Sequence, residues 1–113
     1  MAYLFMSNIK DFDDINNPDD AFQEISIGDT IYFTDSNSIN KKASFLMVRA
    51  HEDNDLLIQI LPYGYGVLVP ATEMWSVDSL NEIEGITIKK AFNPVTSNEL
   101  SDNVKIQWMI GYK

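Results

Sequence analysis

The sequence contains no cysteine and a single histidine, His51. Without thiols the chain forms neither a disulfide nor a thiolate metal site, and it has no cysteine nucleophile. One imidazole also falls short of the three or four nitrogen or sulfur ligands that a zinc site generally needs. We therefore expect no metal and no cofactor.

The carboxylates Glu52, Asp53 and Asp55 follow His51 closely in the sequence. A histidine beside a carboxylate can act as a general base or as a metal ligand. A run of polar residues between two apolar segments is, however, typical of the loop of a β-hairpin. We expect residues 51–55 to form such a loop.

Long hydrophobic runs are also lacking, since no segment approaches the roughly 18 apolar residues of a membrane-spanning helix. The first residues, from Met1 to Asp11, have neither the basic region nor the small-residue cleavage site of a secretory signal. These features predict a cytoplasmic protein that does not enter a membrane.

Recognisable catalytic motifs are lacking as well. The chain has no Gly-x-Ser-x-Gly elbow, no phosphate-binding loop and no dinucleotide fingerprint. Its seventeen acidic residues do not single out a catalytic carboxylate pair, because such a pair is defined by its geometry. We therefore expect a protein that is not an enzyme.

Basic residues are scarce: eight Lys and Arg stand against seventeen Asp and Glu, which gives a formal charge of −9. A surface of this charge repels phosphate backbones, so direct binding of nucleic acid is not expected. A basic protein partner becomes more plausible. The simpler alternative is that the charge only keeps the protein soluble.

Part of this acidity is concentrated near the N-terminus. The acidic residues there are Asp11, Asp13, Asp14, Asp19, Asp20 and Glu24. Their spacing lacks the glycine and the distal glutamate of an EF-hand loop, so we expect no calcium site. Asn17 can cap a helix and Pro18 suits its first position, while aspartates favour the positive end of the helix dipole. The sequence thus predicts a short helix from about Pro18 to Glu24.

From Ser26 onward the apolar residues alternate with a period of two, as they do in β-strands. We expect strands at 30–34, 43–50, 56–61, 67–69, 86–90 and 104–110. The strand at 43–50 is expected to be buried on both faces and to pair with 56–61 as a hairpin. A helical turn is predicted at 78–83, where it would end at Gly85.

Short strands at hairpin spacing favour antiparallel pairing, and in a small chain such strands usually form a barrel or a sandwich. The sequence predicts a mainly β domain with minor α content, namely a small antiparallel, partly open SH3-like barrel preceded by a short acidic helical segment. We expect one domain over residues 1–113, with an N-terminal strand or helical segment at 1–25 and the barrel at 26–113. Such a layout does not by itself fix a function.

The most suggestive stretch for binding is Pro62-Tyr63-Gly64-Tyr65-Gly66. Two tyrosines between glycines can present their rings at the surface, and aromatic residues are enriched in binding hot spots. Trp75 is expected to join them, and Trp108 and Tyr112 could extend the aromatic surface. The alternative is a turn whose tyrosines cover the sheet edge, with Trp108 in the core.

Two functional hypotheses follow. The first is a small acidic, non-enzymatic binding module that recognises another protein through Asp11, Asp13, Asp14, Asp19 and Asp20 or through Tyr63, Tyr65 and Trp75. A sharper form is a phage-type inhibitor that masks the basic nucleic-acid-binding surface of a host protein. The second is a domain that binds a small ligand or a carbohydrate on its aromatic surface. The oligomeric state is not predicted.

Overall fold

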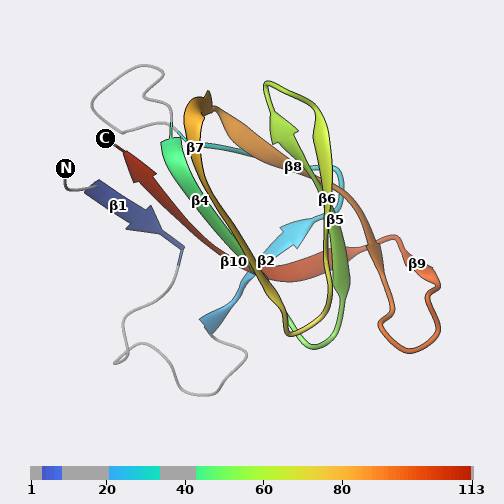
Figure 1. Cartoon of the computed structure of the whole chain (residues 1–113). Helices are drawn as coiled ribbons and strands as arrows, with labels where there is room; N and C mark the ends of the chain where they lie inside the picture. Colours follow the sequence, from blue (N-terminus) through green and yellow to red (C-terminus); the bar gives the residue numbers. More distant parts are fainter. Residues whose placement is uncertain (1–3, 9–20, 34–42, 113) are drawn as a thin grey trace.

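The protein is a mainly β domain in which strands form two antiparallel sheets (Figure 1). The computed structural model describes residues 4–8, 21–33 and 43–112. The described strands are β1 (Leu4–Ser7), β2 (Gln23–Ser26), β3 (Thr30–Tyr32), β4 (Ala43–Ala50), β5 (Asp55–Leu61), β6 (Tyr65–Val69), β7 (Met74–Ile83), β8 (Gly85–Phe92), β9 (Glu99–Leu100) and β10 (Asn103–Tyr112). None of the described segments is a helix long and apolar enough to cross a membrane.

The first sheet is built around β10. Its order is β1-β10-β4-β7, and β2 pairs with the same edge of β10 as β1. The register joins Leu4 to Tyr112 in β1 and Ser26 to Asn103 in β2, so the two strands follow one another along β10. Chain segments from the two ends of the sequence therefore lie side by side in this sheet.

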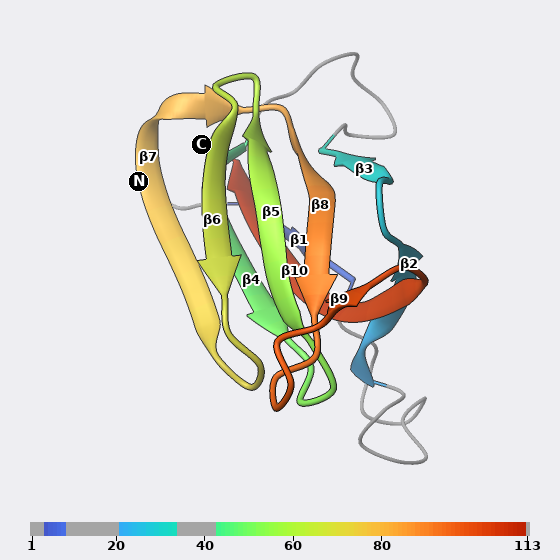
Figure 2. The same ribbon diagram turned by 90° about the vertical axis from the view of Figure 1, so that its right-hand side faces the viewer.

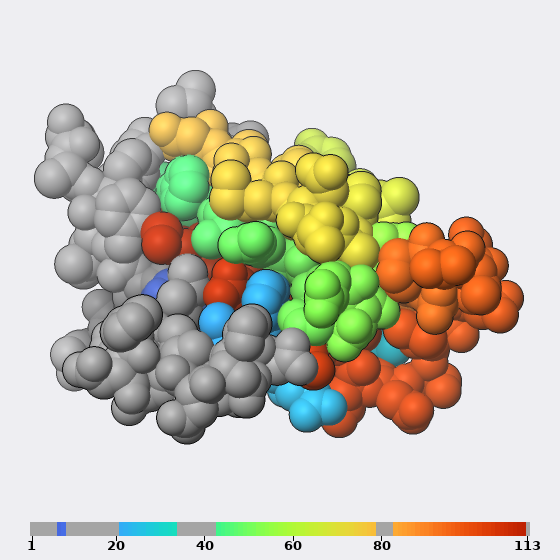
Figure 3. All heavy atoms as spheres, turned by 90° about the horizontal axis from the view of Figure 1, so that it is seen from below, coloured from blue at the N-terminus to red at the C-terminus, as the bar shows by residue number. Residues whose placement is uncertain are grey.

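The second sheet has the order β3-β8-β5-β6, and β9 pairs with β8 beyond β3. Figure 2 shows β8, β5 and β6 side by side, with β7 beyond β6. Seen from one end, the β4–β5 connection (green) and the β6–β7 connection (yellow) lie beside the turn that follows β8 (orange; Figure 3).

The core lies between the sheets because each strand turns alternate apolar side chains inward. In β5, Leu56, Ile58 and Ile60 are buried, while the intervening residues are half-buried. The other main core residues are Leu46, Val48, Val69, Ile86, Ile88, Val104, Ile106 and Ile110. Burying one such side chain contributes about 1.5–3 kcal/mol relative to leaving it exposed, so this interface is the main source of stability.

The prediction of a hairpin between 43–50 and 56–61 is wrong. Both segments are strands, but β4 pairs with β10 and β7, whereas β5 pairs with β6 and β8. The polar residues 51–54 therefore carry the chain from one sheet to the other. The outer face of β4 is also less buried than expected, because Arg49 on that face is exposed.

The predicted acidic helix is not confirmed. Residues 23–26 form strand β2, and its pairing with β10 outweighs the local helix signals. The first part of the predicted helix, residues 18–20, lies outside the described residues. The helical turn predicted at 78–83 is wrong, since these residues continue β7 as far as Ile83.

The predicted partly open SH3-like barrel is likewise not confirmed. The edge strands β6 and β7 are consecutive, but β6 pairs with β5 and β7 pairs with β4, and no pairing joins the two within the described structure. We call the boundary between β6 and β7 the seam. The fold is a pair of sheets that stays open at this seam.

Candidate binding site at the seam between two edge strands

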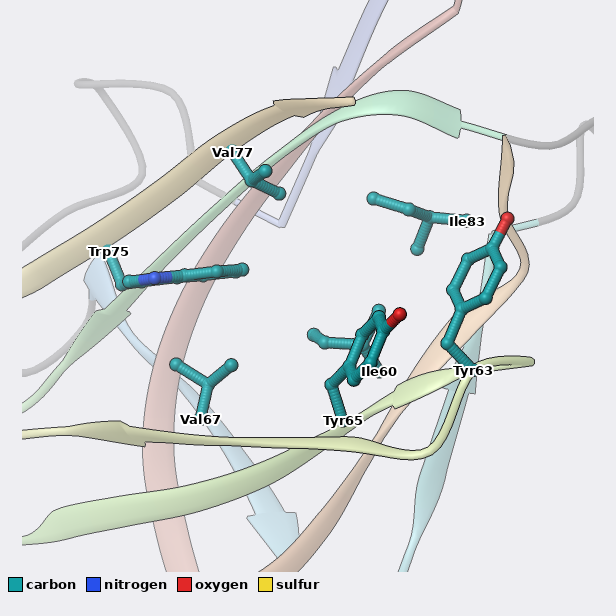
Figure 4. A pocket seen from close by; sticks show the side chains of 7 residues that line it. All are labelled: Ile60, Tyr63, Tyr65, Val67, Trp75, Val77 and Ile83. Carbon is teal, nitrogen blue, oxygen red and sulfur yellow. The ribbon is translucent and has the colours of Figure 1, made fainter. Parts of the chain in front are cut away.

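A cavity of about 130 Å³ lies at the seam. Its lining residues come from β5, from the β5–β6 turn, from β6 and from β7 (Figure 4). They are Ile60, Tyr63, Tyr65, Val67, Trp75, Val77 and Ile83. We call this cavity the seam pocket; its wall is made of aromatic rings and aliphatic side chains, and its only side-chain polar atoms are two hydroxyls and one indole nitrogen.

The β5–β6 turn places the two tyrosines at the pocket. Gly64 has a φ of +80°, a conformation that side-chain-bearing residues rarely adopt, and its N–H donates to the carbonyl oxygen of Ile60 at 2.7 Å. This tight turn stacks the rings of Tyr63 and Tyr65, whose centroids are 5.7 Å apart with an interplanar angle of 16°. The stacked pair forms one end of the pocket.

Strand alternation supplies the opposite wall. Trp75 and Val77 lie two residues apart on β7, and their register partners Val48 and Leu46 are buried in the core. Both β7 side chains therefore point inward, where they are half-buried. Figure 4 shows Trp75 and Val67 at one end of the pocket and Tyr63 and Ile83 at the other.

The connection between β6 and β7 is held by specific hydrogen bonds. The Asp55 carboxylate accepts the N–H of Ala71 at 2.7 Å, and the N–H of Glu73 donates to the carbonyl oxygen of Pro70 at 3.0 Å. Within this turn Thr72 has a φ of 68°. A β-branched residue in this region is strained, so the turn retains its shape against a local conformational cost.

The chain around the seam pocket carries charge of one sign. The stretch from Ala50 to Ile88, which includes every pocket residue, contains neither Lys nor Arg. Its acidic residues are Glu52, Asp53, Asp55, Glu73, Asp78, Glu82 and Glu84. Asp78 and Glu84 directly follow the pocket residues Val77 and Ile83 in the sequence. The sequence segments that form the pocket are therefore acidic, although the pocket lining itself carries no charged side chain.

The structure brings together three residues that the sequence singled out, Tyr63, Tyr65 and Trp75. Trp108 and Tyr112 lie elsewhere on β10. The Trp108 ring is half-buried, with its centroid 5.5 Å from that of Phe33, and Tyr112 is fully buried. The proposed aromatic surface is thus smaller than the sequence allowed.

The acidic candidates Asp11, Asp13, Asp14, Asp19 and Asp20 lie outside the described residues. The residues that flank this segment, Asn8 and Ala21, are bound to the outer edge of β10. That edge is the opposite side of the first sheet from β7 and the seam. Asn8 and Ala21 therefore lie at a different edge of the molecule from Tyr63, Tyr65 and Trp75.

His51 has a structural environment. It is 4% exposed, its ring meets that of Phe22 edge-on at 4.8 Å, and its Nδ1 accepts the N–H of Asp53 at 3.1 Å. The Asp53 carboxylate lies 3.3 Å from the same nitrogen and 3.7 Å from Nζ of Lys105. Among the residues that the structure describes, no group of three His, Asp or Glu side chains is arranged to hold a metal ion.

Sequence reasoning missed the aliphatic residues of the pocket, namely Ile60, Val67, Val77 and Ile83. Their strands were partly recognisable from alternation, but an inward-facing aliphatic residue looks the same in sequence whether it faces a packed core or an open cavity. The missing signal was the lack of pairing between β6 and β7, which depends on the tertiary arrangement.

Comparison of the chain with protein-family models, with curated proteins and with solved structures gives no match. The functional argument therefore depends on the seam pocket and its surroundings.

Proposed function

We propose that the protein is a non-enzymatic binding module that recognises a basic protein partner and holds one apolar side chain of that partner in the seam pocket. The observation that carries this proposal is an apolar cavity bordered by aromatic rings at an unpaired edge of the sheets. Tyr and Trp are enriched among the residues that dominate protein–protein binding energy.

The size of the pocket favours a side chain over a whole ligand. Pockets for small molecules usually measure about 300–1,000 Å³, whereas the seam pocket measures about 130 Å³. A cavity of about 150 Å³ admits a group as large as benzene. The seam pocket therefore matches one aromatic or branched aliphatic side chain.

The chemistry of the pocket argues against the alternative of carbohydrate binding. A sugar presents many hydroxyl groups, and burying them without hydrogen bonds is costly. The pocket offers side-chain polar atoms only from Tyr63, Tyr65 and Trp75. The two tyrosine rings also stack on each other, which occupies ring faces that a sugar would otherwise use.

The charge of the chain supports a basic partner. Electrostatic complementarity accelerates association and selects among partners. A more specific version of this proposal is that the partner is a nucleic-acid-binding protein. The chain would then act as a phage-type inhibitor that masks the basic surface of this partner. This form is supported by the charge of −9 and by the absence of Lys and Arg from 50–88. It predicts competition between the chain and nucleic acid for that partner.

A selection from a displayed library of random dodecapeptides tests the proposal. We expect enrichment of peptides that combine an aromatic or branched aliphatic residue with Lys or Arg. Binding of the synthetic peptide should weaken as salt rises, because exposed charges are screened. The proposal would be overturned if no peptide were recovered. It would also be overturned if the recovered peptides lacked basic residues and bound with an affinity that does not depend on salt concentration.

Two tyrosines with the same exposure provide a matched pair of variants. Tyr65 on β6 and Tyr32 on β3 are each 66% exposed, but only Tyr65 lines the pocket. Tyr65→Ala should reduce affinity for the selected peptide about tenfold, whereas Tyr32→Ala should leave it nearly unchanged. Equal effects of the two variants would place the binding site elsewhere. An oligosaccharide panel that bound the protein and lost binding in Tyr65→Ala would support the carbohydrate alternative.

A further inference from the structure

We infer that the outer edge of β6 accepts an extended segment of the basic partner as an additional strand, with one apolar side chain of that segment directed into the seam pocket. This inference rests on the proposed function, because it names how the same site holds its partner. It adds a main-chain interaction to the side-chain recognition described above.

The edge of β6 is open along its whole length. On one side all five residues pair with β5, from Tyr65 opposite Ile60 to Val69 opposite Leu56. On the other side no described strand pairs with it. In an edge strand, alternate residues direct their N–H and C=O groups outward, where they can bind an incoming backbone.

The sequence of β6 carries none of the usual protection of an edge. Tyr65-Gly66-Val67-Leu68-Val69 contains no charged residue and no proline, which are the residues that commonly discourage strand addition. The apolar side chain of Leu68 on this strand is 58% exposed. An uncharged edge of this kind is suited to pairing with another strand.

The edges at β3, β9 and β7 are better protected. At the opposite side of the second sheet, β3 has three residues and β9 has two. In the first sheet, β7 carries Asp78, and its register with β4 is irregular between Ala43 and Phe45. Charges and irregular pairing both disfavour addition of a further strand. Among these four edges the observations therefore favour β6.

The orientation of β6 links this edge to the pocket. Val67 and Tyr65 face the seam pocket, whereas Leu68 faces away from it. A strand added beside β6 continues the same alternation, so every second side chain of that strand points toward the seam. Main-chain pairing then gives affinity and the pocket selects one side chain, as in other cases of recognition by strand addition.

Charge identifies the incoming segment as basic. Glu73 lies in the turn that follows β6, and the N–H of Glu84 donates to the carbonyl oxygen of Leu61 at 2.9 Å, close to the turn that precedes β6. Acidic residues therefore flank both ends of β6 in the fold, which suits Lys or Arg at both ends of the segment. A second copy of this chain would instead bring another nine negative charges.

An N-methyl scan of the selected peptide tests strand addition. Each synthetic peptide carries one N-methylated residue, which removes one backbone N–H and leaves every side chain in place. We expect a loss of about tenfold in affinity at alternate residues and little change at the residues between them. A flat profile, or a loss that follows a helical period, would overturn the inference.

Amide hydrogen exchange gives a second readout on the protein itself. Addition of the unmodified peptide should slow exchange at alternate amides of residues 65–69 about tenfold or more, because those amides become hydrogen-bonded. The amides of β3, Thr30–Tyr32, serve as the control edge and should not change. Protection of β3 or β7 in place of β6 would assign the added strand to another edge.

These results separate failure of the inference from failure of the proposed function. If Tyr65→Ala weakens binding but the N-methyl scan is flat, the pocket binds a side chain without strand addition and only the inference fails. If no peptide is selected, both fail.

Sedimentation of the free protein tests whether the β6 edge pairs with a second copy of this chain instead of a partner. We expect a monomer. A dimer that dissociates in Leu68→Lys, but persists in Val95→Lys, would overturn the inference and assign the β6 edge to self-association. Val95 is a suitable control because it is an apolar residue with 89% exposure in the turn after β8.

Discussion

Asn8 binds Trp108 through both its backbone and its side chain. The N–H of Asn8 donates to the carbonyl oxygen of Trp108 at 3.2 Å, and Oδ1 of Asn8 accepts the N–H of Trp108 at 2.7 Å. Its Nδ2 also donates to the carbonyl oxygen of Ile106 at 3.1 Å and to Oε1 of Gln23 at 2.9 Å. One asparagine thus bridges the interval between β1 and β2 along the edge of β10.

Replacement of this asparagine should destabilise the first sheet. Asn8→Ala removes the acceptor of the Trp108 N–H, and leaving a buried donor unsatisfied costs about 1–3 kcal/mol. Urea unfolding measures this change in the free energy of unfolding. Asn98→Ala, at an exposed position before β9, is the control and should change stability by about 0.5 kcal/mol or less. Equal losses in the two variants would contradict the bridging role.

Gly85 is required where β3 approaches β8. A Cβ atom at this position would collide with the backbone carbonyl oxygen of Ile31, which cannot move without disturbing the pairing of Ile31 with Ile86. Gly85→Ala should therefore lower the free energy of unfolding by about 1–3 kcal/mol. Gly66→Ala is the matched control, since its Cβ would meet the Leu57 side chain at an ordinary 3.9 Å. The prediction fails if the two variants have the same melting temperature in thermal unfolding.

Thr72 should be replaceable with a gain in stability. Its φ of 68° suits glycine, and strain of this type costs about 1–3 kcal/mol. After subtraction of the backbone entropy that glycine loses on folding, Thr72→Gly should raise the free energy of unfolding by about 1 kcal/mol. Thr72→Ala removes the same side chain but keeps a Cβ, so it should gain less. A larger gain for alanine would show that the backbone at this turn is relaxed.

The seam pocket should admit a small apolar probe. Benzene added to the protein should shift the methyl resonances of Val67 and Val77, which line the pocket, and leave those of the core residue Val104 in place. Val67→Phe fills the pocket and should abolish the shifts. Glucose should produce no shift, because the wall offers few polar groups. Shifts with glucose alone would reverse the preference for an apolar occupant.

The strand at 104–110 could be predicted because its apolar residues alternate regularly in the sequence. Val104, Ile106 and Ile110 are buried and Trp108 is half-buried, as the pattern of apolar residues indicates. The boundaries of β4 were also predicted correctly, since 43–50 is a mostly apolar run. Local patterning therefore identifies most strands in the C-terminal three quarters of the chain.

Strand partners could not be predicted in the same way. The polar connection 51–54 has the length of a hairpin loop, but the partners of β4 and β5 are set by distant strands such as β10. Gly85 looks like a helix terminator in sequence, yet its role is the close approach of Ile31. A glycine can serve either purpose, and only the tertiary structure distinguishes them.

The sequence predicted the aromatic residues of the candidate site but not its aliphatic residues. Tyr63, Tyr65 and Trp75 attract attention because exposed aromatic residues between glycines or in short strands are unusual. Val67 and Val77 carry no such signal. Their contribution depends on the missing pairing between β6 and β7, which no local pattern in the sequence reports.

The position of β10 after the other described strands of the first sheet also determines when that sheet can form. In the described structure β1 and β2 pair with β10, and β4 pairs with it on the other side. During synthesis β1 and β2 emerge before β10, so they cannot form this pairing until β10 has been made. The second sheet, whose main strands β5, β6 and β8 are close in sequence, can assemble earlier. We therefore expect a nascent chain that stops before Asn103 to form β5–β6–β8 pairings while β1 and β2 remain without a partner.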